Sequence, residues 1–138
     1  MAIELDRRGI DVVGTDLDPQ MLAQARSKAP GLQWVEADLA ELQLDARFDL
    51  IVAAGNVMIF VAEGSEAQVT QRMADHLEPA GRLITGFQLR PGGYDLASFD
   101  EHCGAAGLTL TDRWSTWDSE PFEPGNDYAV SVFTKRQA

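Results

Sequence analysis

The sequence predicts a three-layer α/β fold with a mostly parallel sheet and an antiparallel hairpin at its C-terminal end. Strand and helix patterns alternate from Asp11 to Gly107, as in a sheet covered by helices on both faces. The segment Phe48–Ala54 is almost continuously apolar, which is typical of a central parallel strand. Two further strand patterns, at residues 108–117 and 128–133, are joined by a turn without a helix, so they should form a hairpin.

Composition and charge limit the classes of function. The 138 residues are 45% hydrophobic and 24% charged, which suits one globular domain over residues 1–138. The net charge of −11 argues against a nucleic-acid partner, because such proteins need a basic face. There is no apolar run long enough to span a membrane and no signal-peptide pattern, and the single cysteine fits a reducing compartment. We therefore expect a cytoplasmic protein that binds small molecules.

The N-terminal part contains two helix patterns around a strand. A helix at residues 1–9 should end at Gly9, a natural left-handed stop, and it has no N-cap, as if its lead-in lay upstream. A strand over residues 12–16 follows. Asp18 can cap the next helix, with Pro19 at its first position. The predicted buried stripe of that helix consists of Met21, Leu22, Ala25 and Ala29.

Each of the first two strands ends in a carboxylate. Asp16 ends the first, and Asp38 ends the next, at residues 32–38. If the strands are parallel neighbours, both acids lie along one rim of the sheet, where ligands of open α/β proteins bind. An acid there can accept two hydrogen bonds from a ribose diol. The alternatives are local: Asp16 can start a turn or share capping with Asp18, and Asp38 can cap residues 39–42.

The third strand is followed by small residues. Ala54, Gly55 and Asn56 stand at the carboxyl end of the strand that begins at Phe48, and their size would let a ligand approach the backbone. Residues 57–60 are apolar and more typical of core or of a pocket wall than of a specific site.

The next helix should be capped by Ser65 and end at residues 79–81. Its inner face consists of Val69, Met73 and Leu77. His76, near the C-terminal end, is favoured there by the helix dipole, and we expect it to be solvated rather than catalytic.

A strand and a turn-rich segment fill residues 82–94. Leu96, Phe99 and Cys103 then share one face of the last helix, so Cys103 is expected to be a core residue. His102 points away from that face, which argues against a Cys/His catalytic pair.

Four segments, in this order and spacing, resemble the class I S-adenosylmethionine-dependent methyltransferases, and the likeness runs from Met1 to Phe133. The segments are Val12–Pro19 with Met21-Leu22, Val35–Leu39, Phe48–Val52 and Leu77–Leu83. In that family the last segment is usually written L-x-P-G-G-x-L, from which Ala80 departs by one methyl group. The resemblance implies a Rossmann-like methyltransferase sheet, mostly parallel with a C-terminal antiparallel hairpin. It also implies S-adenosylmethionine as cofactor and a small-molecule methyl acceptor.

The same resemblance implies a cofactor site. Asp16 would hold the ribose hydroxyls, and Leu17 would pack on the adenine. Asp38 would accept from the adenine amino group, with the backbone of Leu39 beside it. The methionine end would be lined by Ala54, Gly55 and Asn56.

The resemblance implies neither a catalytic residue nor a metal, since such enzymes mostly act by holding sulfur, methyl carbon and nucleophile in line. Candidates for shaping the acceptor site are Asn56, Gln88, Arg90, Tyr94 and Trp114. Ordinary packing or surface placement is the alternative for each of them.

The family's first strand and its G-x-G-x-G loop, which precede the first helix, are absent from this sequence. In the family that strand lies between the counterparts of the strands at residues 12–16 and 48–54. The unpaired edges would be satisfied by direct pairing, by a strand from a second copy in a homodimer, or by a segment ahead of Met1. We expect this polypeptide to be dimeric through its sheet or marginally stable, and to bind S-adenosylmethionine weakly.

Two other functions stay open. A catalytically inactive methyltransferase-like protein, acting as a binding or interaction module, is favoured by the absent loop. A nucleotide-binding oxidoreductase would also place an acid at the end of its second strand. The L-x-P-x-G-x-L segment and the C-terminal hairpin make the oxidoreductase the weakest of the three.

Overall fold

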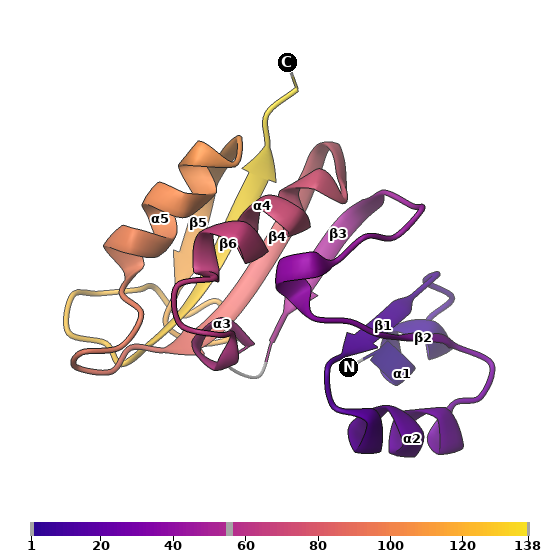
Figure 1. The fold of residues 1–138 in the computed structure, drawn as a ribbon. Coiled ribbons are helices and arrows are strands. Elements are labelled where there is room, and N and C mark those ends of the chain that lie inside the picture. The colour runs from indigo at the N-terminus through magenta and orange to yellow at the C-terminus, as the bar shows by residue number, and fades with distance from the viewer. Residues whose placement is uncertain (1, 55–56, 138) are drawn as a thin grey trace. The chain divides into compact units, whose positions relative to one another are not determined.

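The computed structural model describes residues 2–54 and 57–137. The chain forms two compact units, Met1–Glu41 and Leu42–Ala138. Each unit has its own sheet (Figure 1). No helix in the described ranges is long and apolar enough to cross a membrane.

The first unit is built on two parallel strands. Its elements are α1 (Ala2–Arg7), β1 (Val13–Asp16), α2 (Pro19–Lys28), β2 (Gln33–Glu36) and the 3₁₀ helix η1 (Leu39–Glu41). Gly14 of β1 leaves room for the Trp34 side chain, because a Cβ there would come within 2.2 Å of the indole ring. The Trp34 indole is fixed in turn by a 3.0 Å hydrogen bond from Nε1 to the carbonyl oxygen of Ala29. Packing against Trp34 therefore explains why glycine occupies position 14.

The second unit is a mixed sheet with the strand order β3-β4-β6-β5. Its elements are β3 (Phe48–Ala53), α3 (Val57–Phe60), α4 (Glu66–Asp75), β4 (Leu77–Gln88), α5 (Leu96–Ala105), β5 (Leu108–Trp114) and β6 (Tyr128–Lys135). β3 and β4 are parallel, and β6 is antiparallel to both β4 and β5. The predicted C-terminal hairpin is confirmed. Figure 1 shows α4 and α5 against one face of this sheet.

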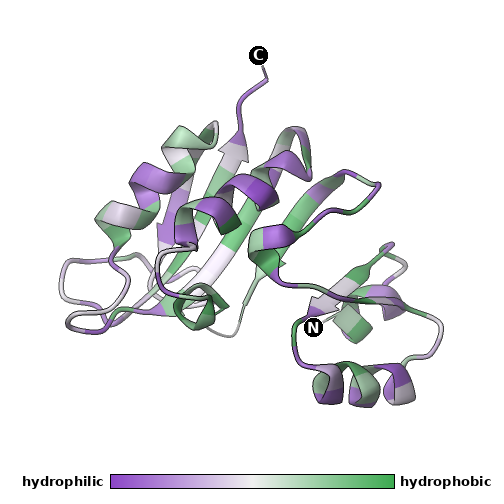
Figure 2. Cartoon of the chain, in the orientation of Figure 1, coloured by the Kyte–Doolittle hydropathy of each residue, from purple (hydrophilic) through white to green (hydrophobic). Residues whose placement is uncertain are grey.

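The core of the second unit lies between this sheet and its helices. Phe99 of α5 makes edge-to-face contacts with Phe87 of β4 and Phe133 of β6, with ring centroids 5.3 and 5.4 Å apart. Such pairs add about 0.5–1.5 kcal/mol beyond their buried area. Figure 2 shows hydrophobic residues along the strands and hydrophilic residues on the outer turns of α4 and α5. The apolar face of the sheet thus holds both helices.

Charged side chains fasten the helices to the strands. Arg113 of β5 donates two hydrogen bonds to the Asp100 carboxylate of α5, at 2.5 and 3.0 Å, and paired bonds of this kind are the strong ones. Lys135 Nζ of β6 donates to the carbonyl oxygens of Ala74 and Leu77, at 2.8 and 2.9 Å. The Lys135 ammonium group therefore ties β6 to the C-terminal end of α4 and to the first residue of β4.

Two predictions about individual helix residues were wrong. Met21 is 52% exposed while Leu22 is buried, so the apolar stripe of α2 is narrower than the sequence suggested. Ser65 occupies the N-cap position of α4, but its side chain makes no capping bond. Its hydroxyl donates instead to the carbonyl oxygen of Ala62 at 2.5 Å.

The predicted end of the next helix was also wrong, since α4 ends at Asp75, and Leu77 and residues 79–81 belong to β4. Ala80 has φ +67°, a left-handed conformation that costs an L-residue roughly 1–2 kcal/mol. A Cβ on Gly81 would lie 2.7 Å from the carbonyl oxygen of Glu78 and 3.1 Å from that of Phe48. The departure at Ala80 from the family's glycine therefore has a conformational cost.

Each of β1 and β3 has one described strand partner, inside its own unit. Within the described residues, β1 pairs with β2 and with no other strand, and β3 pairs with β4 and with no other strand. Each of these two strands thus keeps one edge whose backbone groups have no strand partner.

Candidate functional site

Asp16 and Asp38 lie at the carboxyl ends of two paired parallel strands. Asp16 is the last residue of β1, and its carbonyl oxygen accepts from the N–H of Ala37 at 3.0 Å. Asp38 follows Ala37 directly, and both aspartates are exposed. The two carboxylates therefore share one rim of the first unit's sheet, as the parallel pairing requires.

Each carboxylate also makes one local bond. Asp16 Oδ1 accepts from the N–H of Asp18 at 3.0 Å, and Asp38 Oδ1 accepts from the N–H of Ala40 at 3.0 Å. The turn and capping roles considered from the sequence are thus real. They use one oxygen of each carboxylate, and the contacts among the described residues leave Oδ2 of both aspartates able to accept from a ligand.

The remaining cofactor candidates are distributed over both units. Leu17 is 64% exposed, so an apolar ring can cover it, and Leu39 opens η1. Ala54 directly follows β3 in the second unit. Gly55 and Asn56 lie outside the described residues.

Three of the acceptor candidates lie together. Trp114 of β5 and Gly86 of β4 both stand opposite Val130 of β6, so they share one face of the sheet. Gln88 is two residues along from Gly86 and belongs to the same face. Arg90 donates from Nη2 to Gln88 Oε1 at 2.8 Å. The structure therefore brings together Gln88, Arg90 and the face that carries Trp114.

Tyr94 belongs to the opposite face, against α5. Its ring stacks on those of Phe87 and His102, each with centroids 5.8 Å apart. Burial raises the pKa of Tyr94 above its ordinary range, so the phenol stays protonated and can donate to His102 Nδ1, 2.7 Å away. This pair could not be predicted from the sequence, because a turn and the start of α5 separate the two residues.

Cys103 packs in the core as predicted. It is 0% exposed, and burial raises the pKa of its thiol above the ordinary range. We predict that a thiol reagent at neutral pH labels Cys103 far more slowly in the folded protein than in denaturant. Absorbance of the released thiolate measures both rates. Fast labelling of the folded protein that a ligand suppresses would instead show a functional thiol.

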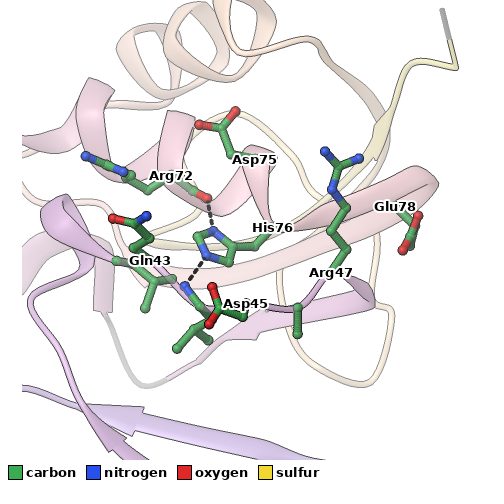
Figure 3. Close-up of a pocket in the computed structure, with 10 residues that line it drawn as sticks. Gln43, Asp45, Arg47, Arg72, Asp75, His76 and Glu78 are labelled. Carbon is green, nitrogen blue, oxygen red and sulfur yellow. Dashed lines mark hydrogen bonds between the residues drawn. The ribbon is translucent and has the colours of Figure 1, made fainter.

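A hollow of about 490 Å³ lies at the amino ends of β3 and β4. Its lining consists of Leu42, Gln43, Leu44, Asp45, Ala46, Arg47, Arg72, Asp75, His76 and Glu78. His76 Nε2 accepts from the N–H of Leu44 at 2.9 Å, and Nδ1 donates to the carbonyl oxygen of Arg72 at 2.6 Å (Figure 3). His76 is 6% exposed, so the prediction of a solvated side chain was wrong. Both ring nitrogens are engaged by the backbone, which makes its role structural.

Residues 2–54 and 57–137 contain no group of three or more His, Cys, Asp or Glu side chains arranged to hold a metal ion. Other ligands can be held by the exposed carboxylates at the end of β1 and after β2 and by the polar and aromatic side chains near the end of β4.

Comparison with known proteins places these elements in a family. A family model described as a methyltransferase domain matches residues 1–81. The chain is 35% identical over 101 residues to a trans-aconitate 2-methyltransferase of Rhizobium leguminosarum bv. trifolii. The aligned residues make up 72% of this chain and 34% of that protein. The chain thus spans about a third of the length of this curated relative.

Two solved structures show the fold. A TehB-like S-adenosylmethionine-dependent methyltransferase from Corynebacterium glutamicum is 38% identical, with a TM-score of 0.91 over 98% of this chain and 73% of that one. The CcbJ methyltransferase from Streptomyces caelestis is 18% identical, with a TM-score of 0.86 over 99% of this chain and 79% of that one. The expected Rossmann-like methyltransferase fold is confirmed. The chain belongs to the family of class I S-adenosylmethionine-dependent methyltransferases.

Proposed function

We propose that this protein, acting as one domain, transfers the methyl group of S-adenosylmethionine to a small-molecule acceptor. In this reaction a nucleophilic atom of the acceptor forms a bond to the methyl carbon while the carbon–sulfur bond breaks. S-adenosylhomocysteine leaves, and any acceptor proton that must be lost passes to water. The protein's task is chiefly to hold the groups in line.

The observation that carries the proposal is the pair of carboxylates at one rim of the first unit's sheet. Asp16 Oδ2 is proposed to accept from the ribose hydroxyls and Asp38 Oδ2 from the adenine amino group, beside the backbone of Leu39. The exposed Leu17 offers the adenine an apolar surface.

The relatives support a small acceptor. The Rhizobium protein is named for a small organic acid, and the 38% identical Corynebacterium structure is named for dependence on S-adenosylmethionine. Because the chain spans about a third of the Rhizobium protein, the acceptor itself stays a proposal.

Substituting Asp16→Ala tests the cofactor site. A hydrogen bond to a charged group contributes roughly 1.5–3 kcal/mol, so the affinity for S-adenosylhomocysteine should fall by about tenfold or more. Calorimetric titration measures this change. Asp11→Ala removes the same charge from another exposed position of the first unit and should leave the affinity within about twofold. Equal affinities for the Asp16→Ala variant and the parent would remove Asp16 from the site.

The open edges of β1 and β3 also bear on assembly. We propose that the 138-residue polypeptide forms a homodimer through these edges, because unpaired strand edges are templates for another chain. Sedimentation equilibrium should then show twice the mass of 15.1 kDa. A single species at the monomer mass of 15.1 kDa over a wide concentration range would contradict the proposal.

A further inference from the structure

An aromatic pair lies directly on the backbone of β4 near its carboxyl end. Trp117, from the loop between β5 and β6, and Tyr128, the first residue of β6, both pack over Gly86. A Cβ on Gly86 would come within 2.5 Å of Tyr128 Oη and 2.6 Å of Trp117 Cζ2. A side chain at this position would displace the pair, so the glycine makes the arrangement possible.

The pair presents a hydrogen-bond donor and an open ring. Trp117 Nε1 donates to Tyr128 Oη at 3.0 Å, so the phenol acts as acceptor in that bond and keeps its own proton to donate. Among the described residues, no acceptor for that proton is found. The Trp117 side chain is 43% exposed, which leaves part of the indole free to contact a ligand.

A cation is linked to this pair through Gln88. Tyr128 stands directly opposite Gln88 in the antiparallel pairing of β4 and β6. Arg90 donates from Nη2 to the side-chain oxygen of that same Gln88 at 2.8 Å. The guanidinium of Arg90 is exposed and carries further N–H groups that can donate.

We infer that Trp117, Tyr128 and Arg90 form the recognition site for the methyl acceptor, and that the acceptor is a planar carboxylate. The carboxylate oxygens accept from Tyr128 Oη and from the Arg90 guanidinium, and the planar body of the acceptor stacks on the Trp117 indole. The end of β4 is also where open α/β sheets bind ligands. This inference rests on the proposed methyl transfer, for which it names the substrate class.

The site can be observed without turnover, through the indole N–H signals of ¹⁵N-labelled protein. The three tryptophans give three such signals, and Trp117→Phe identifies the one from Trp117. Titration with sodium benzoate should shift the Trp117 signal saturably and leave that of Trp34 in place. Benzamide, which is planar but uncharged, should bind at least about fivefold more weakly, since the bonds to a charged oxygen are lost.

Two substitutions and a matched control test the residues. Arg90→Met and Tyr128→Phe should each weaken benzoate binding by about fivefold or more. Arg82→Met removes an exposed cation from the other end of β4, on the same face, and should leave binding unchanged. Melting temperatures of the variants close to that of the parent exclude misfolding as the cause.

The outcomes separate the inference from the function it rests on. If benzoate does not shift the Trp117 signal in protein that binds S-adenosylhomocysteine, the inference is overturned and the proposed function stands. Equal losses from Arg90→Met and Arg82→Met also overturn it, because they would show nonspecific attraction of the anion. A specific benzoate response in protein that fails to bind S-adenosylhomocysteine would make the patch a carboxylate site and remove its role in methyl transfer.

Discussion

Adding a β-strand and a G-x-G-x-G loop ahead of Met1 should raise both the melting temperature and the affinity for S-adenosylhomocysteine. β1 and β3 each keep one edge without a strand partner within the described residues, and Leu50 of β3 is 46% exposed. Each new backbone hydrogen bond contributes about 0.5–1.5 kcal/mol, so a paired strand should add on the order of 3 kcal/mol. Glycine-loop N–H groups aimed at the cofactor should raise its affinity by at least about tenfold.

Two control variants separate the effect of the added strand from that of the glycine loop. Prolines in the added strand prevent pairing, so that variant should gain neither stability nor affinity. Alanines in place of the loop glycines should keep the gain in melting temperature and lose the gain in affinity. A parent polypeptide that is monomeric, melts above about 65 °C and binds the cofactor at low micromolar concentration would contradict the prediction.

Ala80→Gly should stabilise the second unit while Gly81→Ala destabilises it, although the two residues are neighbours. Glycine adopts the left-handed φ of residue 80 without strain, so the substitution should stabilise the folded state by roughly 1–2 kcal/mol. Glycine also has greater freedom in the unfolded chain, which offsets about 0.4–1 kcal/mol of that gain. On Gly81, a methyl group would press on the carbonyl oxygens of Glu78 and Phe48, which cannot rotate away as a side chain can. We expect a loss of about 2–3 kcal/mol.

Urea unfolding followed by circular dichroism measures both changes as shifts of the midpoint in opposite directions. Gly104→Ala is a suitable reference, because a Cβ built there meets no atom within 4 Å apart from the neighbouring backbone of its own helix, α5. That change should be neutral or stabilising. Destabilisation by Ala80→Gly would show that the left-handed conformation is not a strain in this chain.

The sequence was sufficient where the signal is local or where pairing follows from order along the chain. Gly9 and Gly107 end their helices with φ of +83° and +88°, as expected of glycine in a left-handed stop. Asp16 and Asp38 could be placed on one rim because parallel neighbours must align their carboxyl ends.

Other features depend on contacts between distant residues, which periodicity does not report. His76 is buried because the N–H of Leu44, 32 residues away, bonds to its ring. Trp117 lies in a loop that the sequence describes only as polar and turn-rich, and its packing over Gly86 joins two segments that are far apart along the chain. Met21 occupies a position that the helical period assigns to the buried face, yet its exposure depends on which other elements pack there.

The strand order of the second unit has a consequence for how the chain folds during synthesis. β5 joins the sheet only through β6, and β6 is also the antiparallel partner of β4. The edge of β4 that pairs with β6 therefore stays unpaired until residues 128–135 have been synthesised, which is after residues 89–127. At 5–20 residues per second this lasts roughly 2 to 10 s, during which an apolar strand edge is open to other nascent chains. Variants that weaken β6 should accordingly lower the yield of soluble protein more than their equilibrium stability alone would suggest.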